Sequence, residues 1–283
     1  MHLRYAYNTN GCAHHRLPDA LELIAEAGYD GVALTLDWQH LDPLAGDWED
    51  QTHRVATLLR EHKLGCVIET GARFLLNPSE KHEPTLINPV SDRREVRIDF
   101  LKRAVDVAAI LGAETVSFWS GIKQQSVTDD DAMHYLIKGL QSVLAYAQEQ
   151  QVTLSFEPEP GMFIETNADY ERLLDREPAL HDLKLALDLG HVWVTGEGEP
   201  AVAISKYADR LGTVSIEGMN RGVHLHLPLH KGDMPIPPLV RRLQEVNFTG
   251  LVCVELSRES PRAHLAIPES INYLKSLEHD LQA

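Results

Sequence analysis

Cysteine and long apolar runs are both scarce in this chain of 283 residues. The three cysteines, Cys12, Cys66 and Cys253, are widely separated and form no CxxC pair, so the sequence has no disulfide framework. No apolar run approaches the roughly 20 residues that a membrane-spanning helix needs. The first residues, MHLRYAYNTN, also lack the apolar core of a signal peptide. We therefore expect a cytoplasmic protein with no membrane partner.

Basic residues are few. The chain has 26 Lys and Arg against 42 Asp and Glu, which gives a formal net charge of −16. A field of that sign repels a phosphate backbone unless a local basic patch overrides it, so we expect no nucleic-acid partner. The hydrophobic content of 43% and the charged content of 24% are ordinary for a globular enzyme.

Short apolar runs alternate with amphipathic segments along the whole chain. The strand-like runs cover 3–7, 31–37, 64–70, 115–120, 152–157, 183–188, 213–218 and 251–256. Helical patterns lie between them, and no Pro/Ser-rich linker interrupts the series. This pattern predicts one α/β domain over residues 1–283, a (β/α)₈ TIM barrel. The alternative, a doubly wound open sheet, needs a Gly-rich phosphate turn after its first strand, and NTNGCAHH does not supply one.

The segment RGVHLHLPLHKGD, residues 221–233, contains His224, His226 and His230. It lies between the strand predicted at 213–218 and a helix predicted at 237–246, so we expect a loop at the C-terminal end of the barrel. Active sites in this fold gather there. An alternative threading makes GVHLHL itself the seventh strand.

Six predicted strands end in an acidic residue: Asp37, Glu69, Glu157, Asp188, Glu217 and Glu255. Any one of them could equally be a helix N-cap or a salt-bridged acid on the rim. As a set they would repel one another unless a cation held them together, which favours a functional site.

Imidazoles accompany these acids. Asp188 and His191 form D-L-G-H, and the loop histidines His224 and His226 would face them across the same end of the barrel. Zn²⁺, Mn²⁺, Co²⁺ and Fe²⁺ all accept such a mixture of oxygen and nitrogen ligands. The alternative for His224 and His226 is an exposed HxH in a polar loop.

The order of these motifs resembles the xylose isomerase-like barrel superfamily: a Glu on strand five, D-x-x-H on strand six, an HxH loop and a Glu on strand eight. That group contains sugar isomerases and epimerases, some dehydratases, and endonuclease IV. The resemblance covers essentially the whole chain. It implies that Glu157, Asp188 and Glu255 bind a divalent metal ion, and it leaves the substrate open.

One position departs from the superfamily pattern. Ser215 stands near the end of strand seven, where its members usually have a ligand histidine. In endonuclease IV a D-x-H loop after that strand joins the D-x-x-H histidine on a further zinc, so the resemblance adds His191, His224 and His226 as ligands. Under the alternative threading His226 takes the usual position, and it is therefore a ligand either way.

The long segment ETGARFLLNPSEKHEP supplies Glu69, Arg73, Lys81 and His82 as candidate substrate-binding residues. A connection of this length in a compact barrel is usually functional, and its cations could hold an anionic or phosphorylated substrate. Solvated surface is the alternative. Trp119 could stack on a sugar or plug the core. We expect Arg221 to bind substrate oxygens.

The resemblance implies a metal-dependent isomerase or epimerase of a sugar or polyol, including a phosphorylated one. Glu157 and Glu255 would carry a proton to and from the carbon beside a carbonyl group. The expected partner is a small carbohydrate-like molecule, and assembly into a homo-oligomer stays open.

Three other functions stay open. The first is a metal-dependent dehydratase of a cyclic polyol or ketone. The second is a zinc phosphodiesterase or endonuclease, which Asp37 and Glu69 disfavour because such enzymes carry histidines at those strand ends. The third is a non-catalytic barrel, in which Ser215 has emptied the metal site.

Metal titration of wild type, Ser215→His and His226→Ala tests the ligand assignment. If Ser215 marks a lost ligand, the new imidazole should raise the metal affinity, since it donates a nitrogen that a neutral hydroxyl replaces poorly. If His226 fills that role, only His226→Ala should change the affinity. Equal affinities in all three proteins would contradict both assignments.

Overall fold

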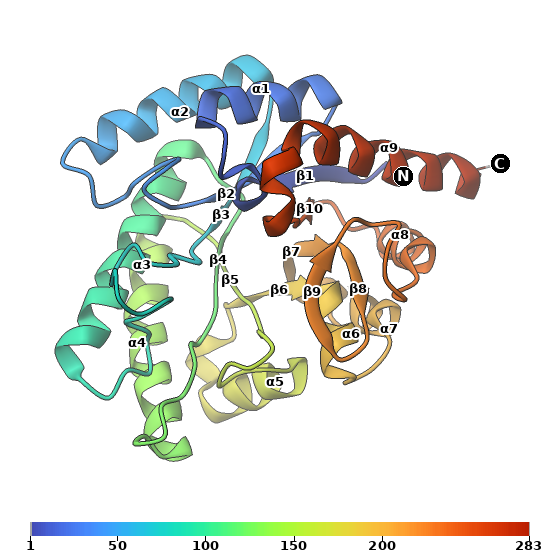
Figure 1. Cartoon of the computed structure of the whole chain (residues 1–283). Helices are drawn as coiled ribbons and strands as arrows, with labels where there is room; N and C mark the ends of the chain where they lie inside the picture. Colours follow the sequence, from blue (N-terminus) through green and yellow to red (C-terminus); the bar gives the residue numbers. More distant parts are fainter. Residues whose placement is uncertain (1, 283) are drawn as a thin grey trace.

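Eight parallel strands close into a barrel in the computed structural model, which describes residues 2–282, with side chains to residue 279. The strands follow one another around the barrel in chain order, so the predicted single-domain TIM barrel is confirmed (Figure 1). They are β1 (Arg4–Asn8), β2 (Gly31–Thr35), β3 (Gly65–Glu69), β4 (Val116–Phe118), β5 (Leu154–Phe156), β6 (Lys184–Asp188), β7 (Leu211–Ile216) and β10 (Leu251–Val254).

The helices surround these strands, and the two ends of the chain lie on the same side of the molecule (Figure 1). Among the described residues we find no helix whose length and hydropathy would let it cross a bilayer. The longer helices are α1 (Leu17–Ala27), α2 (Trp48–His62), α3 (Ser91–Leu111), α4 (Asp129–Glu149), α5 (Asn167–Arg176), α8 (Ile236–Glu245) and α9 (Ala263–Gln282). The shorter ones are α6 (Leu189–Thr195) and α7 (Pro200–Lys206).

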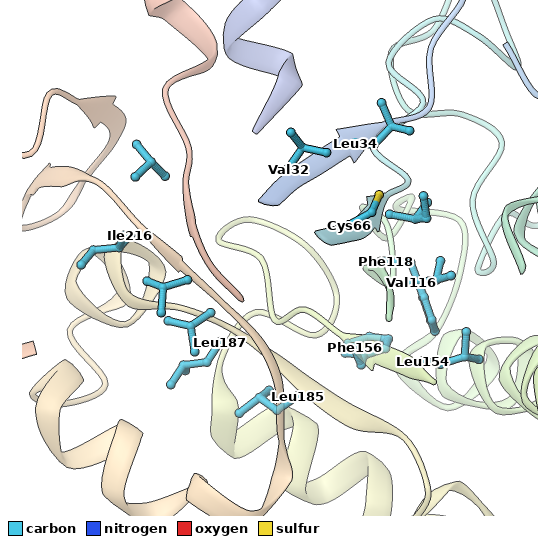
Figure 2. Packing of buried hydrophobic residues seen from close by; sticks show 14 of the residues in the cluster. Val32, Leu34, Cys66, Val116, Phe118, Leu154, Phe156, Leu185, Leu187 and Ile216 are labelled. Carbon is cyan, nitrogen blue, oxygen red and sulfur yellow. The ribbon is translucent and has the colours of Figure 1, made fainter. Parts of the chain in front are cut away.

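Alternation along each strand separates a packing face from an interior face. Large apolar side chains such as Val32, Leu34, Phe156 and Leu187 belong to the main buried cluster, which they share with the helices (Figure 2). The barrel interior instead holds a separate cluster of mostly small residues: Ala6, Ala33, Val67, Leu251 and Cys253. Toward the C-terminal ends of the strands the buried residues become polar, among them Asn8, Thr35 and Asp188.

The histidine-rich segment lies between the seventh barrel strand and the next helix, as predicted, but residues 223–227 form a strand, so the prediction of a loop was wrong for them. β8 (Gly218–Asn220) and β9 (Val223–Leu227) form an antiparallel hairpin within the connection between β7 and α8. Its two-residue turn, Arg221 and Gly222, uses a positive φ of 72° at the glycine, as tight hairpins favour. The alternative threading was also wrong, because the seventh barrel strand is β7.

The outward face of the barrel strands, which packs against the helices, should contribute most of the free energy of unfolding. Phe156 is fully buried, with its ring 5.7 Å from that of Phe118 and 6.3 Å from that of Tyr170. We expect Phe156→Ala to lower the free energy of unfolding by about 3–5 kcal/mol, because it removes an aromatic ring and leaves a cavity. Urea denaturation measures this loss. Val202→Ala, at a side chain 64% exposed, should change it by no more than about 0.5 kcal/mol.

Candidate functional site

A cavity of about 330 Å³ opens at the C-terminal end of the barrel. The connections after β3, β4, β5, β7 and β10 all contribute to its wall. Nine of the predicted site residues line it: Glu69, Arg73, Lys81, His82, Trp119, Glu157, His224, His226 and Glu255. Asp188 and His191 are buried beside them, at 3% and 4% exposure.

Three carboxylates meet at the base of this cavity. Glu157, Asp188 and Glu255, here called the carboxylate triad, each offer an oxygen within 4.8 Å of the others. Glu255 accepts a hydrogen bond of 2.9 Å from the Asn10 amide, and Glu157 accepts one of 3.4 Å from Ser117 Oγ. Asp188 Oδ2 is buried and has no hydrogen-bond partner among the described residues. Ligand oxygens gathered in this way suit a divalent cation.

The D-L-G-H motif is the start of helix α6, where the sequence indicated only a turn. Asp188 is the N-cap residue, and its Oδ1 accepts a hydrogen bond of 2.8 Å from the His191 backbone amide. This cap fixes both side chains relative to each other, so that His191 Nε2 lies 3.5 Å from Asp188 Oδ2.

Three imidazole rings converge beside the carboxylate triad. In this imidazole triad, His224 Nε2 lies 3.1 Å from His191 Nε2 and 3.3 Å from His226 Nε2. Nitrogen ligands at about 2.0–2.1 Å from a tetrahedral zinc ion are themselves about 3.3 Å apart, so the spacing matches a metal site.

Backbone carbonyl groups fix the tautomers of two of these rings. His191 Nδ1 lies 3.3 Å from the Pro158 carbonyl oxygen, and His226 Nδ1 lies 3.2 Å from that of Glu255. A carbonyl oxygen can only accept a hydrogen bond, so each Nδ1 carries the proton and each Nε2 presents a lone pair. Metal-binding histidines are oriented by such second contacts.

Two residues that sequence reasoning missed also line the cavity. Glu159 has an oxygen 3.6 Å from His191 Nδ1 and another 4.0 Å from His224 Nε2. Its position two residues after Glu157 in FEPEPG would have placed it on the same side of an extended segment. Arg258, just after β10, has no comparable sequence signal.

Other predicted residues lie elsewhere. Arg221 does not reach the cavity, because its guanidinium group stacks 3.7 Å from the centre of the Trp193 ring and pairs with Glu199 at 3.3 Å. Asp37 is buried outside the cavity wall and accepts a hydrogen bond of 2.8 Å from the Trp38 amide in a turn, so it is not a helix N-cap. Ser215 pairs in register with Asp188 and is not part of the cavity wall.

Residues 21–277 match the family model of the xylose isomerase-like TIM barrel. The chain belongs to this family. The order of acidic and histidine motifs along the strands had indicated the same relationship, which is confirmed.

Two curated proteins match the chain only in part. The chain is 26% identical over 169 residues to the uncharacterized protein MJ1614 of Methanocaldococcus jannaschii and 22% identical over 160 residues to an inosose dehydratase of Clostridium tetani. These alignments cover 59% and 50% of this chain, and 64% and 53% of those proteins. The chain thus spans less than two thirds of either relative.

The solved structure of a 3-keto-D-glucoside 4-epimerase from E. coli matches with a TM-score of 0.78 at 16% identity. The match covers 97% of this chain and all of the epimerase, and it shows the shared fold alone.

Burial dominates the electrostatics of this xylose isomerase-like site. It raises the pKa of Glu69 and Glu157 well above the usual range, and neighbouring carboxylates raise both further. Burial also lowers the pKa of His191 to about 4, which keeps the ring neutral and able to bind a metal. Burial raises the pKa of Asp188. The nearby imidazoles of His191 and His226 lower it by more, so its pKa is lowered overall.

Glu217 supports the carboxylate triad from behind. It is fully buried against Asp188 and the Gly190 backbone, and burial followed by the charge of Asp188 raises its pKa well above the usual range. Only a glycine fits at position 190, because a Cβ there would overlap Glu217 Oε1.

We expect Gly190→Ala to lower metal affinity by about 10–100-fold, the usual effect of disturbing residues behind a metal ligand. The added methyl group must displace Glu217 and with it Asp188. Calorimetric titration with Zn²⁺ and Mn²⁺ measures the change. Gly198→Ala is the matched control, since a Cβ there meets nothing within 4 Å. Unchanged affinity in Gly190→Ala would remove Glu217 from the support of the site.

Proposed function

We propose that this chain is a divalent-metal-dependent isomerase or epimerase of a sugar or polyol, acting by proton abstraction next to a carbonyl group. The observation that carries the proposal is the carboxylate triad at the base of a cavity of about 330 Å³. Glu157 and Glu255 both line that cavity and can each face one side of a bound carbon atom. The epimerase whose fold this chain shares supports the same reaction class.

The residues present form three overlapping groups that could hold a metal ion. The carboxylate triad offers oxygen ligands, and the imidazole triad offers three nitrogen ligands with two tautomers already set by backbone carbonyls. Among the described residues, no group of three ligands joins His226 to the carboxylates. A third group, Glu157, Glu159 and His191, links the two triads. We therefore assign the six predicted ligands to neighbouring, connected positions rather than to one. A divalent ion bound here would stabilise negative charge on adjacent substrate oxygens.

Proton transfer falls to the two glutamates. A general base works best when its pKa lies near the working pH, and burial raises the pKa of Glu157 in that direction. Glu157 takes the proton from one face of the substrate carbon, and Glu255 returns a proton to the other face. Asn10 holds Glu255 in place through its hydrogen bond of 2.9 Å.

The cavity wall suits a polar ring or chain with one flat side. The Trp119 ring lines it, with the Arg97 guanidinium 4.6 Å from the ring centre and the His82 ring nearly perpendicular to it, the two ring centres 5.1 Å apart. An aromatic ring held in this way can pack against the C–H face of a sugar, while Glu69 and Glu159 accept hydrogen bonds from its hydroxyl groups.

Dehydration of a cyclic polyol or ketone is the second candidate. The partial match to inosose dehydratase favours it, and it begins with the same proton abstraction. NMR analysis of products formed in D₂O separates the two, because an epimerase returns a deuterated isomer whereas a dehydratase releases an unsaturated product.

We expect Glu157→Gln to lower the rate of C–H exchange in D₂O by about 10²–10⁴-fold, the usual contribution of a general base. The amide keeps the shape of the side chain but cannot take the proton. The measurement is deuterium incorporation by NMR, with a panel of hydroxy-ketones and metal-loaded protein.

Glu199→Gln is the control, since this exposed residue lies outside the cavity and should leave exchange unchanged. Circular dichroism confirms that both variants fold. Full exchange in Glu157→Gln would contradict its role as the base. Absence of exchange in wild type with every hydroxy-ketone would contradict the proposed function.

A further inference from the structure

Three basic side chains line the cavity without an acidic partner. Arg73 and Lys81 come from the connection between β3 and α3, and Arg258 comes from the short helical turn after β10. None of the three forms a direct ion pair or a side-chain hydrogen bond with a described residue, although burial raises the pKa of Glu159 and the charge of Lys81 lowers it in part from a distance. Four glutamates line the same cavity: Glu69, Glu157, Glu159 and Glu255. Cations and acids thus face one cavity without direct ion pairs between them.

The connection that carries Arg73 and Lys81 folds back on itself. The His82 backbone amide donates a hydrogen bond to the Arg73 carbonyl, and His82 Nδ1 lies 2.8 Å from the Gly71 carbonyl oxygen. The two basic residues are therefore neighbours around His82. Burial lowers the pKa of His82 to about 4, and the charges of Lys81 and Arg73 lower it further, so the imidazole between them is neutral.

Arg97 anchors this connection from below. Its buried guanidinium group donates hydrogen bonds to the carbonyl oxygens of Thr70, His82 and Pro84, at 3.4, 3.1 and 3.1 Å. These contacts hold both ends of the segment that contains Arg73 and Lys81. The backbone at these positions is fixed before any ligand arrives, which reduces the entropy lost on binding.

Neighbouring cations repel each other, and an anion between them removes that repulsion. Arginine and lysine bind carboxylate and phosphate oxygens through charge-assisted hydrogen bonds, and a neutral sugar would need neither charge. We infer that the substrate carries an anionic group, a carboxylate or a phosphate ester, which Arg73, Lys81 and Arg258 bind at a distance from the reacting carbon. This inference rests on the proposed function for the rest of the substrate.

A set of ligands that differ only in charge tests the inference. Calorimetry on the metal-loaded protein compares a neutral ketose with its phosphate ester and with a sugar acid of the same chain length. We expect at least one anionic ligand to bind about tenfold more tightly than the neutral one, and the two anionic arms tell phosphate from carboxylate. Arg73→Gln, Lys81→Gln and Arg258→Gln should each reduce this preference.

Arg176→Gln is the matched control. It removes the same charge from an exposed arginine that pairs with Asp130, away from the cavity wall, and it should keep the preference of wild type. A preference that survives all three cavity variants would overturn the inference, because the anion would then bind elsewhere, for example at the metal. Equal affinity for neutral and anionic ligands in wild type would also overturn it.

Sulfate binding tests the anion site apart from the proposed reaction, because sulfate is an anion with no carbon atom that the protein could isomerise. We expect wild type to bind sulfate and the Arg73→Gln and Arg258→Gln variants to bind it at least about tenfold more weakly. Sulfate binding with that pattern, together with no C–H exchange on any ketose, would support the anion site and refute the proposed reaction. If wild type binds neither sulfate nor any anionic sugar, no anion site exists.

Discussion

Mutual repulsion among buried carboxylates is the constraint on which the rest of this site depends. Five acidic side chains from the ends of four strands, with Glu217 behind them, occupy the C-terminal end of one barrel. Burial alone raises the pKa of several, and each neighbouring charge adds to the cost of ionising the next. Protons or cations must balance this charge. A bound metal ion would balance part of it.

The barrel can carry this cost because its stability lies on another face. Large apolar residues of the strands pack outward on the helices (Figure 2). The interior instead holds small and polar side chains. The interior therefore leaves room for long acidic side chains above it. Loop substitutions at the C-terminal end can then change the chemistry without disturbing the main core.

Hydrogen bonds to the backbone orient the charged groups. The N-cap of α6 fixes Asp188 against His191, carbonyl groups set the tautomers of His191 and His226, and Arg97 anchors the segment that presents Arg73. Different elements thus position the two sites. Strand ends and the β8–β9 hairpin hold the metal ligands, whereas the connection between β3 and α3, anchored by Arg97, presents Arg73 and Lys81 of the proposed anion site. A substrate with a reacting carbon and a separate anionic group would bridge them.

The sequence by itself determined the barrel, since alternating apolar runs and their spacing are local patterns that fold the same way wherever they occur. It also indicated which strand ends carry acids, because the last residue of each apolar run can be read directly from the sequence. Only the tertiary structure decided that the HLH segment pairs with β8, that Glu159 and Arg258 reach the cavity, and that Arg221 turns to Trp193 and Glu199 instead. Those outcomes depend on contacts between segments that the chain brings together only when the barrel closes.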